Sequence, residues 1–561
     1  MMLQQQDLIL IIKISCMKFR YTSLVVVLAG LMIGGCKEEE TTFADPYAGG
    51  KPPLGIVTNA QQVPVPASGE AGTEVFIAAT GLMKEDGTPR FVRNTELKFQ
   101  FNGEVAEITE ITSAGIKAKV PNRASSGVTA FAIDGQLVFG PTFTVTGRVK
   151  IDPTWKSTIG ANATVTKGIR LPDNNIMILG DFTNYDNKGI VKPINRITRI
   201  LSDGTWDRTI QTGAGANGFV NDMAILNGKY YIAGDFGGYA QRGGGISKIT
   251  QINSTGIIDT VSRETYLKRS VFVSPFNGGV DRVIRSVYSF GGKLIATGDF
   301  NYYLSRRYDQ PSYTYKDSTV IDSVDVRQLV RFNPDGSLDR TWRFLPNAIG
   351  YKGLPGKSLP GGTGRLFSIM HTDGKLLCYG EFPKFDDATV GRIIRLNADG
   401  TIDQTFNPGG AGADDIISSV SFNATTNKYV VVGRFKTFNG VAALNMVQLN
   451  YDGSVDASFA PKAFEGGQPY FVKQLFDGLS VIGGDFKTYD GVSKNGFLIV
   501  DKTGALATGY NTIGNVVGST QKLNDVLEST SVDGKRALIL MGSFSTFDNK
   551  PYNNIIRVTI E

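Results

Sequence analysis

One short motif, Gly-Asp-Phe, recurs along the chain from residue 180 onwards. Four copies are identical, and the other three keep the Gly and the Phe but change the middle residue. The copies begin at Gly180, Gly234, Gly298, Gly380, Gly433, Gly484 and Gly542. Successive copies are 54, 64, 82, 53, 51 and 58 residues apart. A repeat of about fifty residues that holds several strands is typical of propellers and related arrays, so we predict a repeat protein.

Each unit around the motif shows the same order of strand and turn signals. A run of four mostly apolar residues precedes the Gly, for example at residues 230–233, and predicts a strand covered on both faces. A second strand follows, for example at residues 391–396, and ends at an Asp-Gly turn in which Gly can adopt a positive φ. Several units close with Asp-x-Thr/Ser-aromatic, as at residues 339–342. Each unit therefore holds about four strands, the content of one propeller blade.

These motifs resemble the delta-60 repeat, a bacterial β-propeller repeat, over essentially all of residues 148–561. The resemblance implies a seven-bladed β-propeller, with one blade for each copy of the motif. The segment opens with residues 152–155, which end a unit, and stops with residues 555–560, the strand that precedes such an end. We therefore expect its N-terminal strand to complete the last blade and to remove the open sheet edges that invite aggregation.

Residues 52–147 contain no copy of the repeat and form a separate predicted domain. Short alternating strands, for example at residues 72–77 and 97–103, are separated by turns, a pattern typical of an immunoglobulin-like sandwich. The segment is similar to the IPT/TIG family in its Gly-Thr-x-Val strand, its Phe-x-Phe-Asn-Gly hairpin and its closing Pro-Thr-Phe. In surface lipoproteins such domains act mainly as spacers, so the resemblance implies no site here. The predicted fold class is all-β throughout.

The start of the chain is predicted to be an export signal. A basic segment at residues 18–20, an apolar run at residues 24–33 and small residues after it are typical of a secretory signal peptide. This signal peptide is assigned to residues 1–35, and its natural start is expected at Met17.

The end of that signal predicts a lipid anchor. Residues 31–36 resemble the bacterial lipobox, which implies that Cys36 carries the lipid. The alternative is an ordinary signal peptide that happens to contain a Cys. A lipid anchor would hold the protein at a membrane surface without spanning it. The acidic residues 38–40 resemble the surface-export signal of Bacteroidetes lipoproteins, or else form a solvated tether, and residues 36–51 are a linker in either case.

The net charge and the cysteines exclude some classes of protein. The charge is +6 for the whole chain and +4 without the first 35 residues, which hold three basic residues and one Asp. No Lys/Arg cluster with interleaved aromatic residues is present to bind phosphates, so no nucleic-acid partner is predicted. Cys16 and Cys36 precede the folded part and Cys378 lies in an apolar strand, so no disulfide framework is available.

Residues that recur in every unit are predicted to be structural. The Asp of Gly-Asp-Phe could in principle form an acidic ring around a cation. However, Arg434 and Ser543 take its place in two units, which favours a hydrogen bond to a turn. The aromatic residues that follow the Gly by three to five positions, and the three Trp, are likewise expected to pack. They are Tyr185, Tyr239, Phe385, Phe438, Tyr489, Phe547, Trp155, Trp206 and Trp342.

The residues that carry common enzyme chemistry are scarce. The single histidine, His371, lies in a hairpin turn and is expected to be exposed, which argues against His-based acid/base chemistry and His-bound zinc. Cys378 lacks the partly exposed, electropositive setting of a reactive thiol. A pair of carboxylates for glycoside cleavage stays open, although no spacing singles one out. We therefore predict a protein that is not an enzyme and has no cofactor and no metal site.

Three long insertions are the candidate functional segments, because function usually resides in irregular loops on a rigid scaffold. They span residues 261–279, 301–325 and 343–364, in neighbouring units, and are expected to crowd one sector of one face. Exposed aromatic rings beside polar residues suit stacking against sugars. The alternative is that the rings only fix the loops to the propeller. The candidate ligand residues are Tyr302, Tyr303, Arg306, Tyr308, Tyr313, Tyr315 and Tyr351.

These inferences combine into one functional hypothesis with two alternatives. By resemblance to glycan-uptake lipoproteins of Bacteroidetes, we expect a non-catalytic surface lipoprotein that binds a polysaccharide or oligosaccharide. The resemblance also implies a lipid anchor in the outer membrane and transfer of the glycan to a TonB-dependent transporter with its lid lipoprotein. The first alternative is a protein-interaction or structural module without a sugar site. The second is a propeller hydrolase or lyase.

Overall fold

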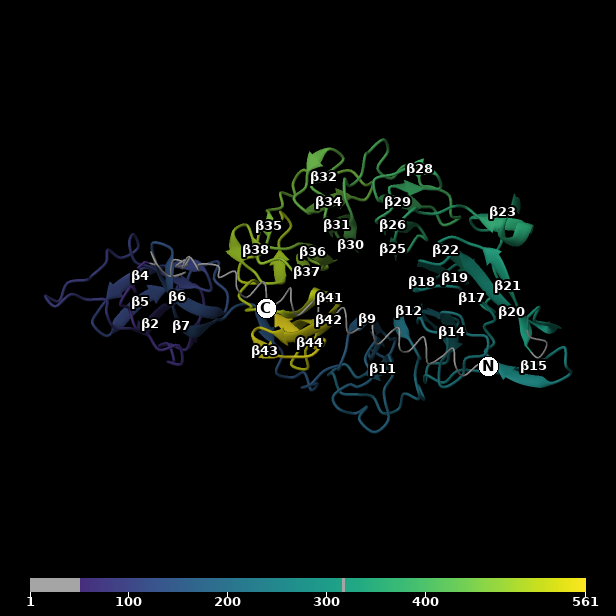
Figure 1. Cartoon of the computed structure of the whole chain (residues 1–561), viewed down its shortest axis with the longest axis horizontal. Helices are drawn as coiled ribbons and strands as arrows, with labels where there is room; N and C mark the ends of the chain where they lie inside the picture. The colour runs from purple at the N-terminus through teal and green to yellow at the C-terminus, as the bar shows by residue number, and fades with distance from the viewer. Residues whose placement is uncertain (1–50, 315–317) are drawn as a thin grey trace, which may run out of the picture. The chain divides into compact units, whose positions relative to one another are not determined.

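The computed structural model describes residues 51–314 and 318–561 (Figure 1). The chain divides into two compact units, Met1–Gly55 and Ile56–Glu561. The second unit contains all the strands of the described residues.

The regular secondary structure of the described part of the chain consists almost entirely of strands. It holds 44 strands and one short 3-10 turn, η1 (Tyr351–Gly353), which confirms the predicted all-β fold class. No helix within the described ranges is long and apolar enough to cross a membrane. The predicted signal peptide, the anchor residue Cys36 and the candidate ligand residue Tyr315 lie outside the described residues.

The N-terminal domain is a curled sheet with one buried face. Its strands are β1 (Ser68–Gly69), β2 (Glu74–Ala78), β3 (Lys98–Phe101), β4 (Glu104–Ile111), β5 (Gly115–Lys119), β6 (Gly127–Ile133) and β7 (Gln136–Val145), in the order β1-β7-β6-β3-β4-β5-β2. Side chains alternate between the two faces of a strand, and in β3 Phe99 is buried whereas Lys98 is exposed. Phe99 contacts Phe101 and Phe131 edge to face, with ring centroids 5.3 and 5.0 Å apart. The alternating sequence pattern of this segment therefore does produce a one-sided core.

Seven small antiparallel sheets follow one another along the described part of residues 149–561 and form the blades of a β-propeller (Figure 1). Blade by blade, the strands are β9 (Val165–Arg170), β10 (Ile176–Gly180) and β11 (Ile197–Ile200); β12 (Phe219–Leu226), β13 (Lys229–Asp235) and β14 (Ile249–Ile252); β18 (Ile284–Phe290), β19 (Lys293–Gly298) and β22 (Leu329–Phe332); β25 (Leu366–Met370), β26 (Leu376–Gly380) and β29 (Ile393–Leu396); β30 (Ile417–Asn423), β31 (Lys428–Gly433) and β34 (Met446–Asn450); β36 (Pro469–Gln474), β37 (Ser480–Gly484) and β40 (Phe497–Val500); and β41 (Val517–Thr530), β42 (Arg536–Phe547) and β44 (Ile555–Ile560). In each blade the middle strand pairs with the other two, and the first strand lies nearest the centre of the ring.

Small hairpins lie beside these blades. They are built from β27 (Lys384–Phe385), β28 (Ala388–Thr389), β32 (Thr437–Phe438), β33 (Val441–Ala442), β35 (Phe464–Glu465), β38 (Thr488–Tyr489), β39 (Val492–Ser493) and β43 (Lys550–Pro551). The aromatic residues that were expected to pack occur here: Phe385, Phe438, Tyr489 and Phe547 are fully buried, as are Tyr185 and Tyr239. Their predicted structural role is confirmed.

The ring is closed by the strand that precedes the first blade. Strand β8 (Val149–Ile151) pairs antiparallel with β44, with Ile151 opposite Val558 and Val149 opposite Ile560. The last blade thus contains strands from the two ends of the propeller segment. This is the pairing expected from the sequence, and it covers the edge that β44 would otherwise expose.

The Gly of the repeated motif is required by a close approach to the first strand of its own blade. A Cβ at Gly180 would lie 2.1 Å from the carbonyl oxygen of Thr164, and the six other copies would meet the matching carbonyl at 1.8–2.2 Å. The same carbonyl accepts a hydrogen bond from the residue after the Gly, since Asp181 N–H donates to Thr164 over 3.0 Å. The Phe of the motif is buried in all seven copies. The motif therefore fixes the distance between two strands and the packing of one ring.

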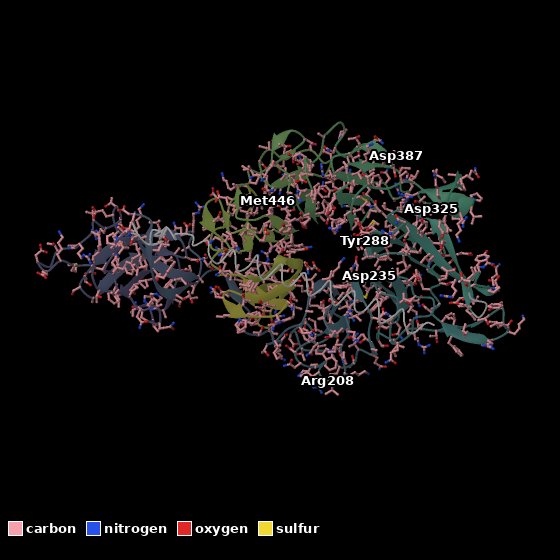
Figure 2. All side chains as sticks on the ribbon, in the orientation of Figure 1. Arg208, Asp235, Tyr288, Asp325, Asp387 and Met446 are labelled. Atoms are coloured by element: carbon pink, nitrogen blue, oxygen red, sulfur yellow. The ribbon has the colours of Figure 1, made fainter. Side chains whose placement is uncertain are left out.

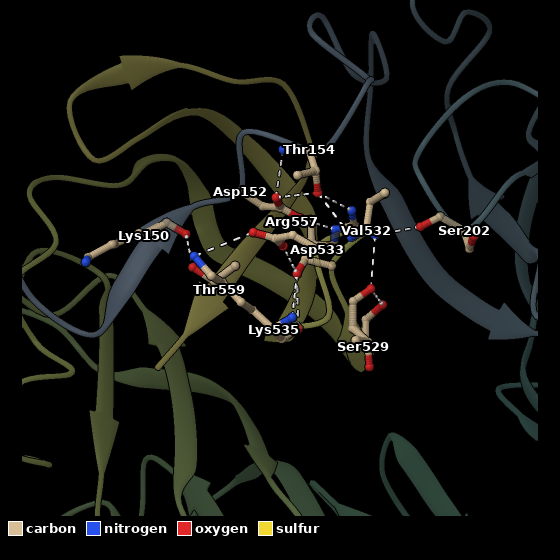
Figure 3. A network of polar contacts seen from close by, with 12 residues as sticks. Lys150, Asp152, Thr154, Ser202, Ser529, Val532, Asp533, Lys535, Arg557 and Thr559 are labelled. Carbon is tan, nitrogen blue, oxygen red and sulfur yellow. Dashed lines mark hydrogen bonds and ion pairs between the residues drawn. The ribbon is translucent and has the colours of Figure 1, made fainter.

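The closing motif, Asp-x-Thr/Ser-aromatic, is an ion-paired turn at the outer edge of the blade. In the last blade Asp152 Oδ1 accepts hydrogen bonds from the N–H and the hydroxyl of Thr154 at 2.8 and 2.7 Å, and Asp152 Oδ2 pairs with Arg557 on β44 (Figure 3). The guanidinium of Arg557 lies 4.8 Å from the centroid of the Trp155 ring. The same ion pair recurs as Arg199–Asp207, Arg331–Asp339 and Arg395–Asp403. One carboxylate thus ends the turn and joins it to the neighbouring strand.

The expected fourth strand is reduced to one bridging residue in most blades. Leu396 pairs with Ile402, and Ile200 pairs with Trp206 in the same way. The next residue is the Asp of the closing motif in the first blade and in the fourth, and its turn directs the chain away from the sheet. Among the described residues, only the last blade has a fourth strand of three residues, because β8 is supplied by the other end of the segment.

Candidate ligand-binding surfaces

The three long insertions form hairpins that lie together at the outer edge of the ring (Figure 1). They contain β15 (Val261–Glu264) with β16 (Ser270–Val273), β20 (Tyr302–Pro311) with β21 (Thr319–Asp325), and β23 (Phe344–Ile349) with β24 (Pro355–Ser358). The last two hairpins and β17 (Gly279–Val280) join in one sheet of order β17-β20-β21-β24-β23, which we call the rim sheet, and β15 contacts β20. The three insertions do lie in one sector of the propeller, as expected. They meet at the outer edge of the ring, whereas the sequence predicted that they would crowd one of its faces.

Strand alternation separates two neighbouring candidate residues in the rim sheet. Tyr303 is only 5% exposed and pairs across the sheet with Val280 and Val324. Its hydroxyl donates to the carbonyl of Gly336 over 3.1 Å, as that of Tyr185 does to Gly204. Tyr303 therefore holds an Asp-Gly turn and belongs to the core. Its assignment as a ligand contact is corrected, because its ring is not accessible.

Tyr302, one residue earlier, lies on the opposite face of the rim sheet, in a row of aromatic, acidic and basic side chains. The register places Tyr302 opposite Asp325, Asp325 opposite Lys357, and Lys357 opposite Leu345. Facing residues of paired strands share one side of the sheet, so an aromatic ring, a carboxylate and an ammonium group stand side by side. The ring of Tyr302 contacts that of Tyr351 with centroids 4.8 Å apart and planes at 58°. Both rings are partly exposed.

The other candidate residues of the hairpin divide into supporting and exposed groups. Arg306 Nη1 donates to the carbonyl and the hydroxyl of Thr319 at 3.2 and 2.9 Å, so it ties β20 to β21. Tyr308 is half-buried, and its carbonyl accepts a hydrogen bond from Tyr266 N–H. Tyr313 is 92% exposed. Both sequence interpretations thus apply: Tyr303, Arg306 and Tyr308 fix the hairpin, whereas the rings of Tyr302, Tyr313 and Tyr351 are open to a ligand.

A second candidate site lies at the centre of the ring, where the sequence analysis placed none. The first strands of all seven blades line a cavity of about 450 Å³, which we call the channel cavity. Phe367 on β25, Phe422 on β30 and Phe471 on β36 contribute to its wall. Tyr288 on β18 lies beside the same centre (Figure 2). An Asn-Asp pair occurs on two of the first strands, as Asn221-Asp222 and Asn524-Asp525. This pair is the one repeated signal in the sequence that could have indicated the channel cavity.

The charged residues of the channel cavity are partly paired. Lys167 Nζ lies 2.7 Å from Asp222 Oδ1, and Arg285 Nη2 lies 2.5 Å from Asp299 Oδ2. Burial raises the pKa of the Asp525 carboxyl, although nearby positive charges and two backbone N–H groups act in the opposite direction. The cavity is therefore polar without a large excess of either charge.

Two residues considered for catalysis are buried. His371 is only 6% exposed, in contrast to the exposure expected for its turn, because the side chain points between two blades and contacts Phe422 at a centroid distance of 4.5 Å. Burial lowers the pKa of His371 to about 4. Burial raises the pKa of the Cys378 thiol to about 12. In the described ranges no group of three or more His, Cys, Asp or Glu side chains is arranged to hold a metal ion.

The second residue of Gly-Asp-Phe forms ion pairs within its unit, where a hydrogen bond to a turn was expected. Asp181 pairs with Arg196 at 3.1 Å. The remaining pairs are Asp235–Lys248, Asp299–Arg285, Glu381–Arg365 and, with the two charges exchanged, Arg434–Asp415. Asp485 differs, since it accepts a hydrogen bond from the N–H of Gln468. These carboxylates are therefore engaged one by one and form no shared ring.

Comparison with known families and structures agrees with this architecture. Residues 35–141 match a domain of unknown function, DUF5008, and residues 317–341, 371–406 and 425–459 match DUF5122, a β-propeller domain of unknown function. The first match falls mainly on the segment for which the IPT/TIG resemblance stays a prediction. No curated protein matches the chain.

Several solved structures are distantly similar to this chain. The WD40 β-propeller domain of Doa1 has a TM-score of 0.39 at 10% identity, over 74% of this chain and 97% of that one. An auxiliary nutrient-binding protein from Bacteroides thetaiotaomicron VPI-5482 has a TM-score of 0.30 at 10% identity, over 79% and 99%. XC5397, a gluconolactonase from Xanthomonas campestris, has a TM-score of 0.28 at 10% identity, over 74% and 90%. Scores this low carry no argument about ligands or partners.

Proposed function

We propose that this protein is a non-catalytic cell-surface lipoprotein that binds a polysaccharide or oligosaccharide through the rim sheet. In this proposal Cys36 carries the lipid, the N-terminal domain is a spacer, and the propeller presents the binding surface. The protein would act as an accessory to nutrient uptake, with a TonB-dependent transporter and its lid lipoprotein as partners at the outer membrane.

The observation that carries the proposal is the row of Tyr302, Asp325 and Lys357, with Tyr351 against Tyr302. A sugar ring has apolar C–H faces and a rim of hydroxyls, so it is bound best where an aromatic face adjoins hydrogen-bonding groups. Here the carboxylate accepts from hydroxyls and the ammonium group donates to them. Because the row lies on an open sheet at the edge of the ring, it suits a long chain that must extend past the protein on both sides.

The unreactive state of two residues supports binding without catalysis. His371 stays neutral well below pH 6 because its pKa is about 4, and its ring is enclosed by aromatic neighbours. The Cys378 thiol has a pKa of about 12 and is fully buried. Neither is placed to attack or to protonate a substrate at the surface.

Affinity gel electrophoresis tests the proposal. The full-length chain in mild detergent is run through native gels that contain neutral or acidic polysaccharides, and at least one polysaccharide is expected to retard it. The Tyr302→Ala/Tyr351→Ala variant should lose affinity about tenfold or more, which is the loss of roughly 1.4 kcal/mol that stacking contacts supply. Phe139→Ala is the matched control, because Phe139 is 62% exposed and lies on the N-terminal domain.

The outcomes of this experiment separate the hypotheses. If no polysaccharide retards the protein, the sugar-binding function is contradicted. Release of products from the same panel would instead support a hydrolase or lyase. For the anchor, Cys36→Ser should abolish incorporation of labelled palmitate, and incorporation that persists would contradict lipidation at this residue.

A second candidate function is supported by exposed aliphatic residues on the same sheet. Leu345, Ile349 and Leu354 of the β23–β24 hairpin are 40%, 64% and 59% exposed. Large apolar side chains that cluster at a surface mark protein-interaction sites. In that case the rim sheet would bind a protein partner. Leu354→Ser should then weaken co-purification of the transporter without changing glycan retardation.

A further inference from the structure

The channel cavity has one apolar wall and one polar wall. Phe367, Phe422 and Phe471 come from the first strands of three consecutive blades and form the apolar wall, which Ser418, Ser419 and Ser421 of β30 interrupt. Asn221 on β12 and Asn524 on β41 belong to the polar wall on other blades. A cavity with this division accepts a ligand that has an apolar face and a polar edge.

The polar groups of this cavity are held in place by hydrogen bonds between blades. Asn524 Nδ2 donates to the carbonyl of Val165 over 3.1 Å, and Asn221 Nδ2 donates to that of Ile284 over 2.8 Å. In both residues the amide nitrogen faces the next blade, which leaves the side-chain oxygen as an acceptor. Asp525 Oδ2 accepts the N–H of Gly168 on the neighbouring blade at 3.1 Å. These acceptors are thus positioned before a ligand arrives, which lowers the cost of binding.

The charges of the cavity favour a neutral ligand. Lys167 and Arg285 are neutralised by their partners Asp222 and Asp299. Lys473 on β36 takes part in no ion pair among the described residues, and its positive charge acts on Asp525 from a distance. One ammonium group and one carboxylate outside any ion pair among the described residues therefore remain at separate points of the wall. An anionic ligand that reached Lys473 would bring its charge close to Asp525.

We propose that the channel cavity binds one or two rings of a neutral sugar, as a site separate from the rim sheet. Sugar hydroxyls both donate and accept, so they can receive from Lys473 and donate to Asp525 and Asn524. The C–H face of the ring packs against the apolar wall. The volume of about 450 Å³ lies within the range of small-ligand sites, roughly 300–1,000 Å³. This inference rests on the proposed function only for the class of ligand.

Isothermal titration calorimetry on the full-length chain in mild detergent tests the proposal. The neutral disaccharides maltose, cellobiose, laminaribiose and xylobiose are titrated beside digalacturonate as a charged comparison. At least one neutral disaccharide is expected to bind, and digalacturonate should bind more weakly. Lys473→Met should weaken the neutral disaccharide about tenfold or more, and Asp525→Asn should weaken it too. Lys550→Met is the matched control, because Lys550 is exposed on β43. This variant should bind the neutral disaccharide with unchanged affinity.

The rim variant makes the two sites distinguishable. Tyr302→Ala should keep the disaccharide affinity of the channel cavity and lose polysaccharide retardation. The proposal is overturned if none of the four neutral disaccharides binds, if binding survives both Lys473→Met and Asp525→Asn, or if digalacturonate binds more tightly than they do. Disaccharide binding that is lost in Tyr302→Ala but not in Lys473→Met would assign all sugar binding to the rim sheet.

Discussion

Replacement of the single histidine should remove one defined component of the pH dependence of stability. His371 Nε2 lies 3.0 Å from the hydroxyl of Tyr429, and Arg395 Nη1 lies 3.3 Å from the same hydroxyl. An Arg can only donate, so the hydroxyl accepts from Arg395, and its own proton is free to be donated to the neutral ring of His371. That arrangement requires an unprotonated Nε2. A proton on Nε2 would leave the hydroxyl with two donors and the imidazolium in an apolar setting.

The magnitude follows from the pKa of His371 in the two states. Burial is the main cause that lowers it to about 4, from about 6.5 in the unfolded chain; Arg395 and Lys375 act in the same direction and Asp373 in the opposite one. Between these two values the unfolded state binds the proton and the folded state does not, so stability falls as pH falls from 6.5 to 4. The full effect is about 3 kcal/mol, of which about 2 kcal/mol is lost between pH 7.5 and pH 5.

Thermal unfolding measures this component by difference. For a chain with about 500 folded residues, 2 kcal/mol corresponds to a change in Tm of about 2 °C. His371→Gln keeps a hydrogen-bonding side chain but does not titrate, so its Tm should fall less than that of the native chain between pH 7.5 and pH 5, by about that amount. Tyr429→Phe is the control for the cause. It removes the hydrogen bond and keeps the burial, so its Tm should be lower at both pH values while most of the difference between them persists.

Two results would refute this reasoning. One is an equal loss of Tm in the native chain and in His371→Gln over the same pH range. The other is an NMR titration of labelled imidazole with a pKa near 6.5 in the folded protein. Because the chain has one histidine, the labelled spectrum contains the signal of this residue alone.

Three further outcomes are expected from the fold. Gly298→Ala should lower Tm by several degrees or prevent folding, because its Cβ would lie 2.2 Å from the carbonyl oxygen of Val283, the residue before β18, whereas Gly237→Ala should fold normally, since nothing lies within 4 Å of the new methyl; equal stability of the two variants would contradict the account of the motif. Arg557→Met leaves a buried carboxylate unpaired and should cost about 3–5 kcal/mol, measured as a fall in Tm; an unchanged Tm would show that this pair does not stabilise the closure. Tyr303→Ala should cost about 3–5 kcal/mol, as for other buried aromatic residues, and a change below 1 kcal/mol would place its ring outside the core.

The parts of the fold that the sequence predicts are those fixed by contacts within one unit. Gly180 faces a carbonyl sixteen residues earlier in the same blade, and this local constraint recurs in each copy, so the motif is visible in the sequence. The closing turn of Asp152 is local in the same way. The closure of the ring could be predicted from the two ends of the propeller segment, because β8 and β44 are the two halves of one interrupted unit.

The parts that were missed depend on contacts between units. Tyr303 is an exception, because it stands five residues after Gly298, as Tyr185 does after Gly180, and this repeat position already indicates a buried ring. His371 is buried by residues of the next blade, which its own turn does not indicate. The channel cavity is lined by residues from the first strands of all seven blades, and their types differ from blade to blade, for example Lys167, Asn221 and Phe471. A pattern search within units therefore does not find it.

The closure of the ring by β8 also decides how the protein carries mechanical load. Tension applied between the N-terminal end of the chain and a ligand held on the propeller is carried first by contacts of the N-terminal domain with the propeller, such as the ion pair of Arg123 with Asp490. Once these contacts are broken, the tension passes through β8, because that strand is where the chain enters the ring. The joint consists of three paired positions on β44 and the ion pair beside them. In a single-molecule pulling experiment from the N-terminus, β8 should be the first element of the propeller to detach, and the last blade should open before any other.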